Sequence, residues 1–505
     1  MSAAARVLRL VSDAGPQTCA MGMNGQQLRS GRPATLPATT AGSRPDGRRL
    51  TSLDGLRGLA ALIVVVHHCA LAAPLLAAQY LTPDPHAPHA WLTFSPAHLL
   101  WAGGEAVLVF FVLSGLVLSR PFLARVRPGT WLSYYPKRVV RLYVPVVAAV
   151  VLTGLVLTLV PRTGGADWGW WMAGHVVPAD PRVLAHDAFL LDGNGWSNSA
   201  LWSLRYEVLF SLFLPLFVVL ARGLDVPLWA SLPVAGWAVY WTTAHGHQAL
   251  SYMSIFAVGV LLAHHMDELH ALGARISAGP ASALRWSGLL VVSLVMIGAQ
   301  WWPHLFLDAT HLWLAPAGRA VVTLGAAVLV FCFLCSPGAR SFGNSRPLQW
   351  LGKVSFSLYL VHEPLVVSVA TKLPPSLRSL PVGVGLGLVV SLIVAAVFHH
   401  LVERPSQRLA NLVGTGLGRL RSAPTADVGG AGPASPDRGT RTTAFPAVVP
   451  VPRPARPARL APPTPSIPSS GGPDHRAPAA WTSGPEDSGW ESDAGVAEHV
   501  HLSRV

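Results

Sequence analysis

The chain has 505 residues, of which 51% are hydrophobic and only 12% are charged, and its mean hydropathy is +0.43. This balance excludes a string of soluble domains and indicates a membrane protein with many spans. The formal net charge of +13 does not indicate nucleic-acid binding, because the arginines sit mostly at the ends of apolar runs, where membrane topology alone would place them.

The two ends of the chain differ in composition from its middle. Residues 1–50 are rich in Arg, Gly, Ser and Pro, and we expect them to form a disordered tail. They lack an apolar core followed by a small-residue cleavage site, so no cleaved signal peptide is predicted. Residues 51–410 form the predicted transmembrane domain. Residues 411–505 are rich in Pro, Ala, Ser and Gly and are again predicted to be disordered.

The apolar runs predict an all-α bundle of about ten transmembrane helices, at about 55–76, 98–119, 139–160, 200–221, 226–243, 249–265, 286–303, 312–335, 354–371 and 381–402. Most loops alternate between rich and poor in Lys and Arg, with Lys372 and Arg378 as the main exceptions. This alternation predicts a multi-pass protein of the cell membrane with both termini in the cytoplasm. Residues 161–199, which hold Trp, Gly, Asp and Pro, are expected to form a folded outer loop.

The first span carries ionisable side chains inside an apolar run. A helix turns about 100° and rises about 1.5 Å per residue, so Arg57 and His68 share one face, roughly 16 Å apart along the axis. Asp54 falls on the same stripe, whereas His67 is rotated away from it. An ionisable group at such depth is costly and indicates function. We therefore expect His68 to act as a general base, the alternative being an interior histidine bonded to a neighbouring helix.

Three further ionisable residues lie at the ends of predicted spans. Arg138 and Arg141 are three positions apart on one helical face, which suits binding of a phosphate-bearing cofactor and equally suits topological anchoring. Glu207 lies about a turn and a half inside the fourth span, where contact with lipid would be costly. We expect it to line one cavity with His68, and pairing with Arg205 is the alternative.

Two other features have simpler alternatives. His362 lies in the middle of the ninth span, where a bond between helices competes with a functional role. Cys332 and Cys335 have a zinc-like spacing, but the sequence offers no second ligand pair. No metal site is therefore predicted.

Six stretches occur in a characteristic order: LDGLRGLAALIVVVHH, FFVLSGLVLS, YYPKRVVRLY, WSLRYEVLFSLFLP, LGKVSFSLYLVHEPL and HHLVERPSQRL. Together they resemble the acyltransferase-3 family of integral membrane O-acyltransferases, in its stand-alone form without a C-terminal esterase-like domain, over about residues 50–410. The resemblance implies transfer of an acyl group, commonly acetyl, from acyl-CoA to a sugar hydroxyl of a surface polysaccharide or a glycosylated metabolite. It implies acyl-CoA as donor substrate and no bound cofactor.

The resemblance also implies roles for individual residues. Arg57 and His68 match the family's signature of an arginine, ten residues and a histidine. His68 is then the catalytic residue, and Arg57 orients the donor. Arg138 and Arg141 match the paired arginines of the third span, which implies that they bind the phosphates of the acyl donor.

Three positions carry less specific matches. Trp202 and Glu207 match a Trp-Ser-Leu segment followed by an acid, although many relatives have two acids there. Glu207 is expected to hold the acceptor or to tune His68 in catalysis. His362 matches a position that holds histidine or tryptophan, and we expect it, with Trp202, to bind substrate.

A transporter or flippase for a lipid-linked sugar or a proton-coupled solute is the alternative from another functional class. Such a protein would also carry buried His, Glu and Arg. The sequence shows no inverted repeat, and its motifs cluster at the predicted inner face, so it favours the enzyme. A membrane scaffold would not explain ionisable residues at mid-depth.

Overall fold

The computed structural model of the chain describes residues 50–124, 130–162, 167–190, 197–223, 226–307 and 313–422. Most of the two predicted disordered tails, residues 1–49 and 423–505, therefore lies outside the described residues. Every regular element in the described ranges is a helix. The predicted all-α fold class is confirmed.

Each of the ten predicted spans corresponds to a helix. These are α1 (Thr51–Leu71), α4 (Gly103–Ala124), α5 (Thr130–Leu159), α8 (Trp202–Gly223), α9 (Leu228–Ala244), α10 (Gln248–His264), α12 (Ser282–Ile297), α13 (Leu314–Cys335), α15 (Arg346–Ala370) and α16 (Leu380–Phe398). Shorter helices connect them: α2 (Pro74–Ala78), α3 (Trp91–Phe94), α6 (Trp170–Gly174), α7 (Pro181–Phe189), α11 (Met266–Ser277), α14 (Pro337–Gly343) and α17 (Arg404–Ser422).

Fewer helices than ten are both long and apolar enough to cross a membrane. In the described ranges seven meet this description, or eight if α10 and α11, bent by 71° at their junction, form one span. Helices α9 and α10 have only 17 residues each, at the lower limit for a span. Helix α15 has 25 residues but carries polar groups along much of its length.

Exposed apolar side chains cover whole faces of several long helices. Examples are Val147, Val151 and Leu155 on α5, Val291 and Val295 on α12, and Val389, Ile393 and Val397 on α16. A soluble protein rarely leaves such faces in water, whereas lipid accepts them. The chain is thus a multi-pass membrane protein.

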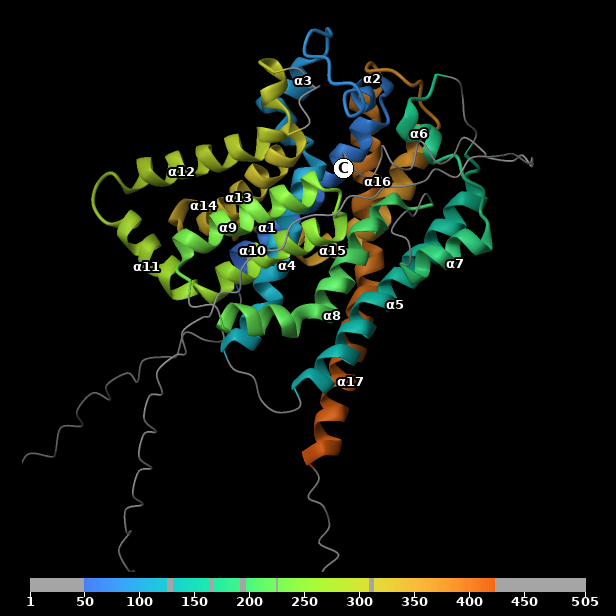
Figure 1. The fold of residues 1–505 in the computed structure, drawn as a ribbon. Helices are drawn as coiled ribbons and strands as arrows, with labels where there is room; N and C mark the ends of the chain where they lie inside the picture. Colours follow the sequence, from blue (N-terminus) through green and yellow to red (C-terminus); the bar gives the residue numbers. More distant parts are fainter. Residues whose placement is uncertain are drawn as a thin grey trace, which may run out of the picture. The chain divides into compact units, whose positions relative to one another are not determined.

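Helix α1 packs against both α4 and α15 (Figure 1). A Cβ atom at Gly58 would overlap the backbone of Gly352, so only glycine lets α1 and α15 approach this closely. Helices α4 and α10 meet in the same way at Gly115 and Gly259, where an added Cβ would overlap a backbone carbonyl of the other helix.

After α16 the backbone makes a π-helical turn, η6 (His399–Glu403), and continues as α17 along α5 (Figure 1). The Ser406 hydroxyl donates to the Val140 carbonyl at 3.3 Å. Residues 411–422, predicted as the start of the disordered tail, are therefore helical. The sequence did not reveal this because α17 is held by its packing against α5, a contact that its polar composition alone does not indicate.

Candidate active site

Two histidines from distant parts of the sequence meet where α1 packs against α15. His68 Nδ1 and His362 Nε2 are 2.7 Å apart, although the residues are separated by 294 positions. Their ring planes differ by 18°, and the ring centroids are 4.9 Å apart. His362 is fully buried, whereas His68 is half-buried. The structure thus brings together two of the residues that the sequence singled out.

The hydrogen bonds of this pair fix which ring nitrogen carries each proton. His362 Nδ1 lies 3.0 Å from the Leu358 carbonyl oxygen and 2.9 Å from that of Tyr359. Because a carbonyl oxygen only accepts, His362 Nδ1 must donate, and its Nε2 in the neutral ring accepts. His68 Nδ1 is then the donor between the rings. Neutral His68 consequently keeps its lone pair on Nε2, the form a general base requires.

His67 belongs to a different network. Its Nδ1 donates to the Trp101 carbonyl at 2.9 Å and lies 3.3 Å from the Tyr80 hydroxyl. Its side chain is buried, and a Cβ at Gly103 would overlap its ring. The two adjacent histidines thus face different neighbours, as the helical rotation of about 100° predicts.

A cavity of about 140 Å³ lies toward the N-terminal end of α1. It is lined mainly by α1, α4, α5, α8 and α15, and its polar lining residues are Arg57, Ser114, Arg138, Arg141, Ser203, Glu207, Ser355, Tyr359 and Glu403. All three arginines that were expected to bind the donor therefore lie around one space. Arg138 is half-buried and Arg141 is exposed.

Glu207 pairs with Arg138 inside this arginine cavity. Arg138 donates from Nη2 to Glu207 Oε1 at 2.5 Å and from Nε to the Ser211 hydroxyl at 2.9 Å. Among the described residues that line the cavity, His68 is not included. Glu207 and His68 were expected to line one cavity, and the structure instead gives Glu207 an arginine partner. Glu207 thus fixes the direction in which the Arg138 guanidinium points.

Tyr359 stands between the arginine cavity and the histidine pair. Its ring lines the cavity, and its ring centroid is 5.9 Å from that of His362. Its hydroxyl is 2.6 Å from the Ser203 hydroxyl. Tyr359 was not singled out from the sequence, because an aromatic residue within an apolar span is an ordinary packing residue.

Glu403 is a second acid of the arginine cavity that sequence reasoning missed. Its Oε2 accepts from the Ser357 hydroxyl at 2.5 Å and from His399 Nδ1 at 2.9 Å, and its Oε1 accepts from Gln407 at 2.9 Å. It ends the π-helical turn η6, an irregularity often found at functional sites. The stretch HHLVERPSQRL contains Glu403, but nothing in the sequence places it near Arg57.

Trp202, expected to bind substrate, lies among aromatic rings. Its ring centroid is 5.2 Å from that of Tyr252 and 6.2 Å from that of Phe111. In the described part of the chain it does not line the arginine cavity. Its position therefore fits packing of α8 against α4 and α10.

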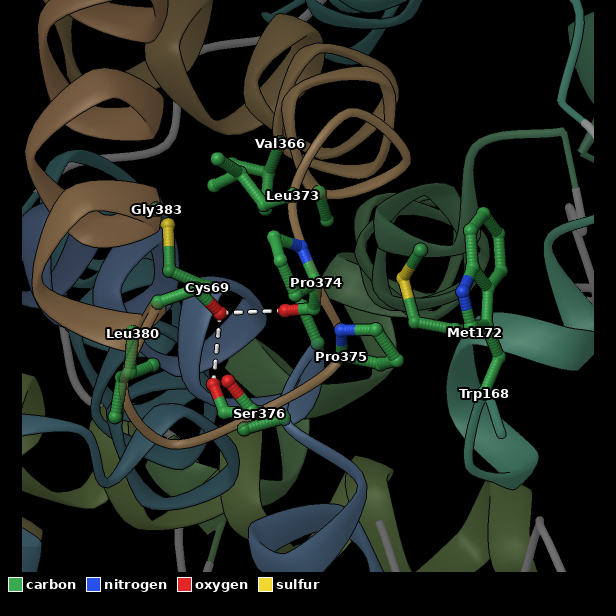
Figure 2. Close-up of a pocket in the computed structure, with 14 residues that line it drawn as sticks. Cys69, Trp168, Met172, Val366, Leu373, Pro374, Pro375, Ser376, Leu380 and Gly383 are labelled. Atoms are coloured by element: carbon green, nitrogen blue, oxygen red, sulfur yellow. Dashed lines mark hydrogen bonds between the residues drawn. The ribbon is translucent and has the colours of Figure 1, made fainter. Parts of the chain in front are cut away.

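A smaller cavity of about 30 Å³ lies at the C-terminal end of α1, just beyond His68. Figure 2 shows Cys69 and Leu380 on one side of it, Trp168 and Met172 on the other, and Pro374 and Pro375 between them. The Ser379 hydroxyl donates to the carbonyls of Pro374 and Ser376, which holds this turn in place. The described residues that line it carry no charge.

The family model described as "Acyltransferase domain" matches residues 50–400, which include both histidines and all the arginines of the cavity. The chain belongs to this family. It is therefore an acyltransferase, as the resemblance implied, and the alternative reading as a transporter is not retained.

Three curated relatives support this. The chain is 24% identical to the putative peptidoglycan O-acetyltransferase YrhL of Bacillus subtilis over 71% of its own length and 55% of that protein. It is 26% identical to the O-acetyltransferase PaAT-1 of Phomopsis amygdali over 62% of this chain and 71% of the relative. It is 27% identical to the acyltransferase MdmB of Streptomyces mycarofaciens over 75% and 95%.

The acyltransferase thus spans little more than half the length of the Bacillus relative and nearly all of the Streptomyces relative. No solved structure gives a significant match to it.

Proposed function

We propose that this acyltransferase moves an acyl group, commonly acetyl, from acyl-CoA to a hydroxyl of a sugar in a surface polysaccharide or a glycosylated metabolite. The observation that carries the proposal is the hydrogen-bond chain from the Tyr359 carbonyl through His362 to His68, which leaves the lone pair of neutral His68 on Nε2. A base of this kind is needed to take a proton from an acceptor hydroxyl.

The donor is proposed to bind in the arginine cavity. Arg57, Arg138 and Arg141 surround this space, and guanidinium groups bind phosphate oxygens through paired N–H donors. Glu207 holds Arg138, so that the guanidinium is oriented before the donor arrives. The phosphates would lie at the exposed Arg141, and the thioester would reach inward toward Tyr359 and the histidines.

The chemical step is proposed as a direct transfer. His68 Nε2 takes the proton of the acceptor hydroxyl while its oxygen attacks the thioester carbonyl carbon. The C–S bond of the thioester breaks as the C–O bond of the new ester forms. The leaving thiolate of coenzyme A takes up the proton that His68 accepted, so the ring returns to its neutral form. General-base help of this kind contributes about 10²- to 10⁴-fold in rate.

The acceptor is proposed to approach from the opposite end of α1. The small cavity beside Cys69 lies there, and its uncharged lining suits a neutral sugar hydroxyl. Two relatives carry names of O-acetyltransferases, one of them for peptidoglycan, which supports a sugar-like acceptor. In the proposed orientation, the arginine cavity and both termini face the cytoplasm. The donor and the acceptor would then enter from opposite sides of the cell membrane.

Purified protein in detergent, supplied with acetyl-CoA labelled in its acetyl group, tests this proposal. Given sugars with free hydroxyls, the protein should release the free thiol of CoA and form a labelled sugar ester in equal amounts. Propionyl-CoA and butyryl-CoA serve to define the acyl group. If no thioester is consumed with any acceptor of a broad glycan and glycoside panel, while the protein remains folded, acyl-CoA is not the donor.

A further inference from the structure

Trp171 covers one face of the His68 ring. The two rings are nearly parallel, at 14°, with centroids 5.5 Å apart. Trp171 comes from α6, in the loop after α5, and not from a membrane-spanning helix. Its side chain is only 2% exposed. A loop residue therefore limits how the imidazole of the proposed base can turn.

The loop that carries Trp171 is held by His175. His175 Nδ1 donates to the Trp171 carbonyl at 2.6 Å, and the two rings lie 4.3 Å apart. On its other side, His175 Nε2 lies 2.8 Å from Glu363 Oε1, and both side chains are fully buried. This close contact joins the segment that carries Trp171 to α15.

Arg162 connects the same loop to α15. Its Nη1 donates to the His175 carbonyl at 3.1 Å, and its Nη2 donates to the Pro364 carbonyl at 3.3 Å. Glu363 directly follows His362, the hydrogen-bond partner of His68. Glu363, which contacts His175, and His362, which orients His68, are thus neighbours on α15.

We propose that His175 and Glu363 are positioning residues that press Trp171 against His68. The proposal rests on the function of His68 proposed above. Glu363 fixes His175, His175 fixes the backbone of Trp171, and the Trp171 ring together with His362 holds the imidazole from two sides. A ring clamped in this way keeps Nε2 aimed at the acceptor, and a base that is free to turn loses much of its rate advantage.

The burial of Glu363 and His175 indicates that their contact does more than fill space. A buried carboxylate and a buried imidazole are costly to desolvate, and replacing them with apolar residues is often neutral or stabilising. Their presence beside the proposed base is explained if they orient it. The contacts of Glu363 also explain why an acid follows His362 directly in the span.

The experiment compares three alanine variants with two matched conservative variants. All are made in the full-length protein and assayed in detergent. Glu363→Ala, His175→Ala and Trp171→Ala should lower kcat by about 10- to 100-fold and leave the KM for the acyl donor unchanged. Glu363→Gln can still bond to His175 through its amide, and Trp171→Phe still stacks on His68. The kcat of both variants should stay close to that of the unmodified protein.

A second readout does not depend on activity. Diethyl pyrocarbonate carbethoxylates accessible histidines, and mass spectrometry measures the reaction at each residue. The reaction at His68 should be faster in the three alanine variants. Labelling at His67, which has other partners, should not change and serves as the internal reference. Unchanged kcat and unchanged His68 labelling in folded Glu363→Ala and His175→Ala would overturn the proposal. If His68→Ala itself keeps full activity, the proposed function fails instead. The labelling of His68 in the other variants still reports whether His175 and Glu363 hold Trp171 against it.

Discussion

His68 and His67 are adjacent in sequence and differ in what their ring nitrogens bond. Helical geometry separates their directions by about 100°, so the sequence alone distinguished the residue that shares a face with Arg57. It could not give the protonation pattern of His68, because this depends on His362, 294 positions away, and on two carbonyls of α15. It also gave Glu207 the wrong neighbourhood, because the depth of a residue in a span does not say which helix it faces.

The paired arginines give a prediction for donor binding. Arg138→Ala and Arg141→Ala should each raise the KM for acyl-CoA by about 10-fold, equivalent to about 1.4 kcal/mol per site, because each removes a charge-assisted contact to phosphate. The kcat should change little, since neither residue lies at the histidine pair. Initial rates over a range of acyl-CoA concentrations measure both constants.

Lys137 provides the matched control for this prediction. It is exposed on the same helix, next to Arg138, and in the described structure it does not line the arginine cavity. Lys137→Ala should leave the KM unchanged. If Lys137→Ala and Arg141→Ala raise the KM equally, the effect is a general one of positive charge, and the two arginines serve as topological anchors.

Asp187 gives a prediction for stability against pH. It lies on α7, and burial, together with the nearby Glu363, raises its pKa to about 6, although the Ser197 hydroxyl donates to it and His186 lies near. A carboxyl group whose pKa rises on folding holds its proton longer when folded. Its contribution favours the folded state at low pH and is lost as pH rises from about 4 to about 6.

Replacing this carboxyl should therefore change the shape of the pH profile. Above pH 6, Asp187→Asn should unfold at a higher temperature than the unmodified protein, by an amount equivalent to about 2 to 3 kcal/mol. Near pH 4 the two proteins should be alike. Thermal unfolding in detergent across this range measures the difference, and parallel profiles would show that Asp187 is not perturbed.

At the scale of elements, long apolar runs predicted where the helices lie, because the hydrocarbon core demands about twenty apolar residues per span. The ends of helices were harder to predict. Helix α15 begins at Arg346 and not near 354, because its polar first turns bind to other parts of the protein: Gln349 donates to the carbonyls of Thr51 and Gly343 at 2.7 Å. Helix α6, which carries Trp171, was not predicted, because a helix of five residues is stable only when other parts of the folded protein pack against it.

The contact between α4 and α10 gives a prediction for packing. Gly115→Ala should destabilise the protein by about 1 to 3 kcal/mol, because the new Cβ overlaps the Phe256 carbonyl and the helices must separate. Gly288→Ala is the control, since a Cβ there meets nothing within 4 Å. The unfolding midpoint in detergent should fall for Gly115→Ala only. Equal midpoints would mean that the two helices tolerate a wider spacing.

At the scale of the whole molecule, the arrangement of two cavities on either side of the histidine pair could not be predicted from the sequence. The arginine cavity draws residues from α1, α4, α5, α8 and α15 as well as Glu403 of η6. Only the crossing of these helices sets which side chains share a space. What the sequence did predict was the class of fold and the residue types that chemistry would need.

The orientation in the membrane gives a prediction for labelling. In a variant without the four native cysteines, a cysteine at His86, in the exposed loop after α2, should react with an impermeant maleimide on intact cells. A cysteine at Ala278, after α11, should react only when the membrane is permeabilised. The reverse pattern would place the arginine cavity outside and remove the cytoplasmic route for acyl-CoA.

The central claim is that Nε2 of His68 is the base of acyl transfer, and the rate of His68→Ala tests it most directly. In protein that inserts into the membrane and binds acyl-CoA normally, this variant should lose transfer by at least about 100-fold. The variant His68→Gln, which keeps a hydrogen-bonding side chain but no base, should be equally impaired. Full transfer by either inserted variant would contradict the account.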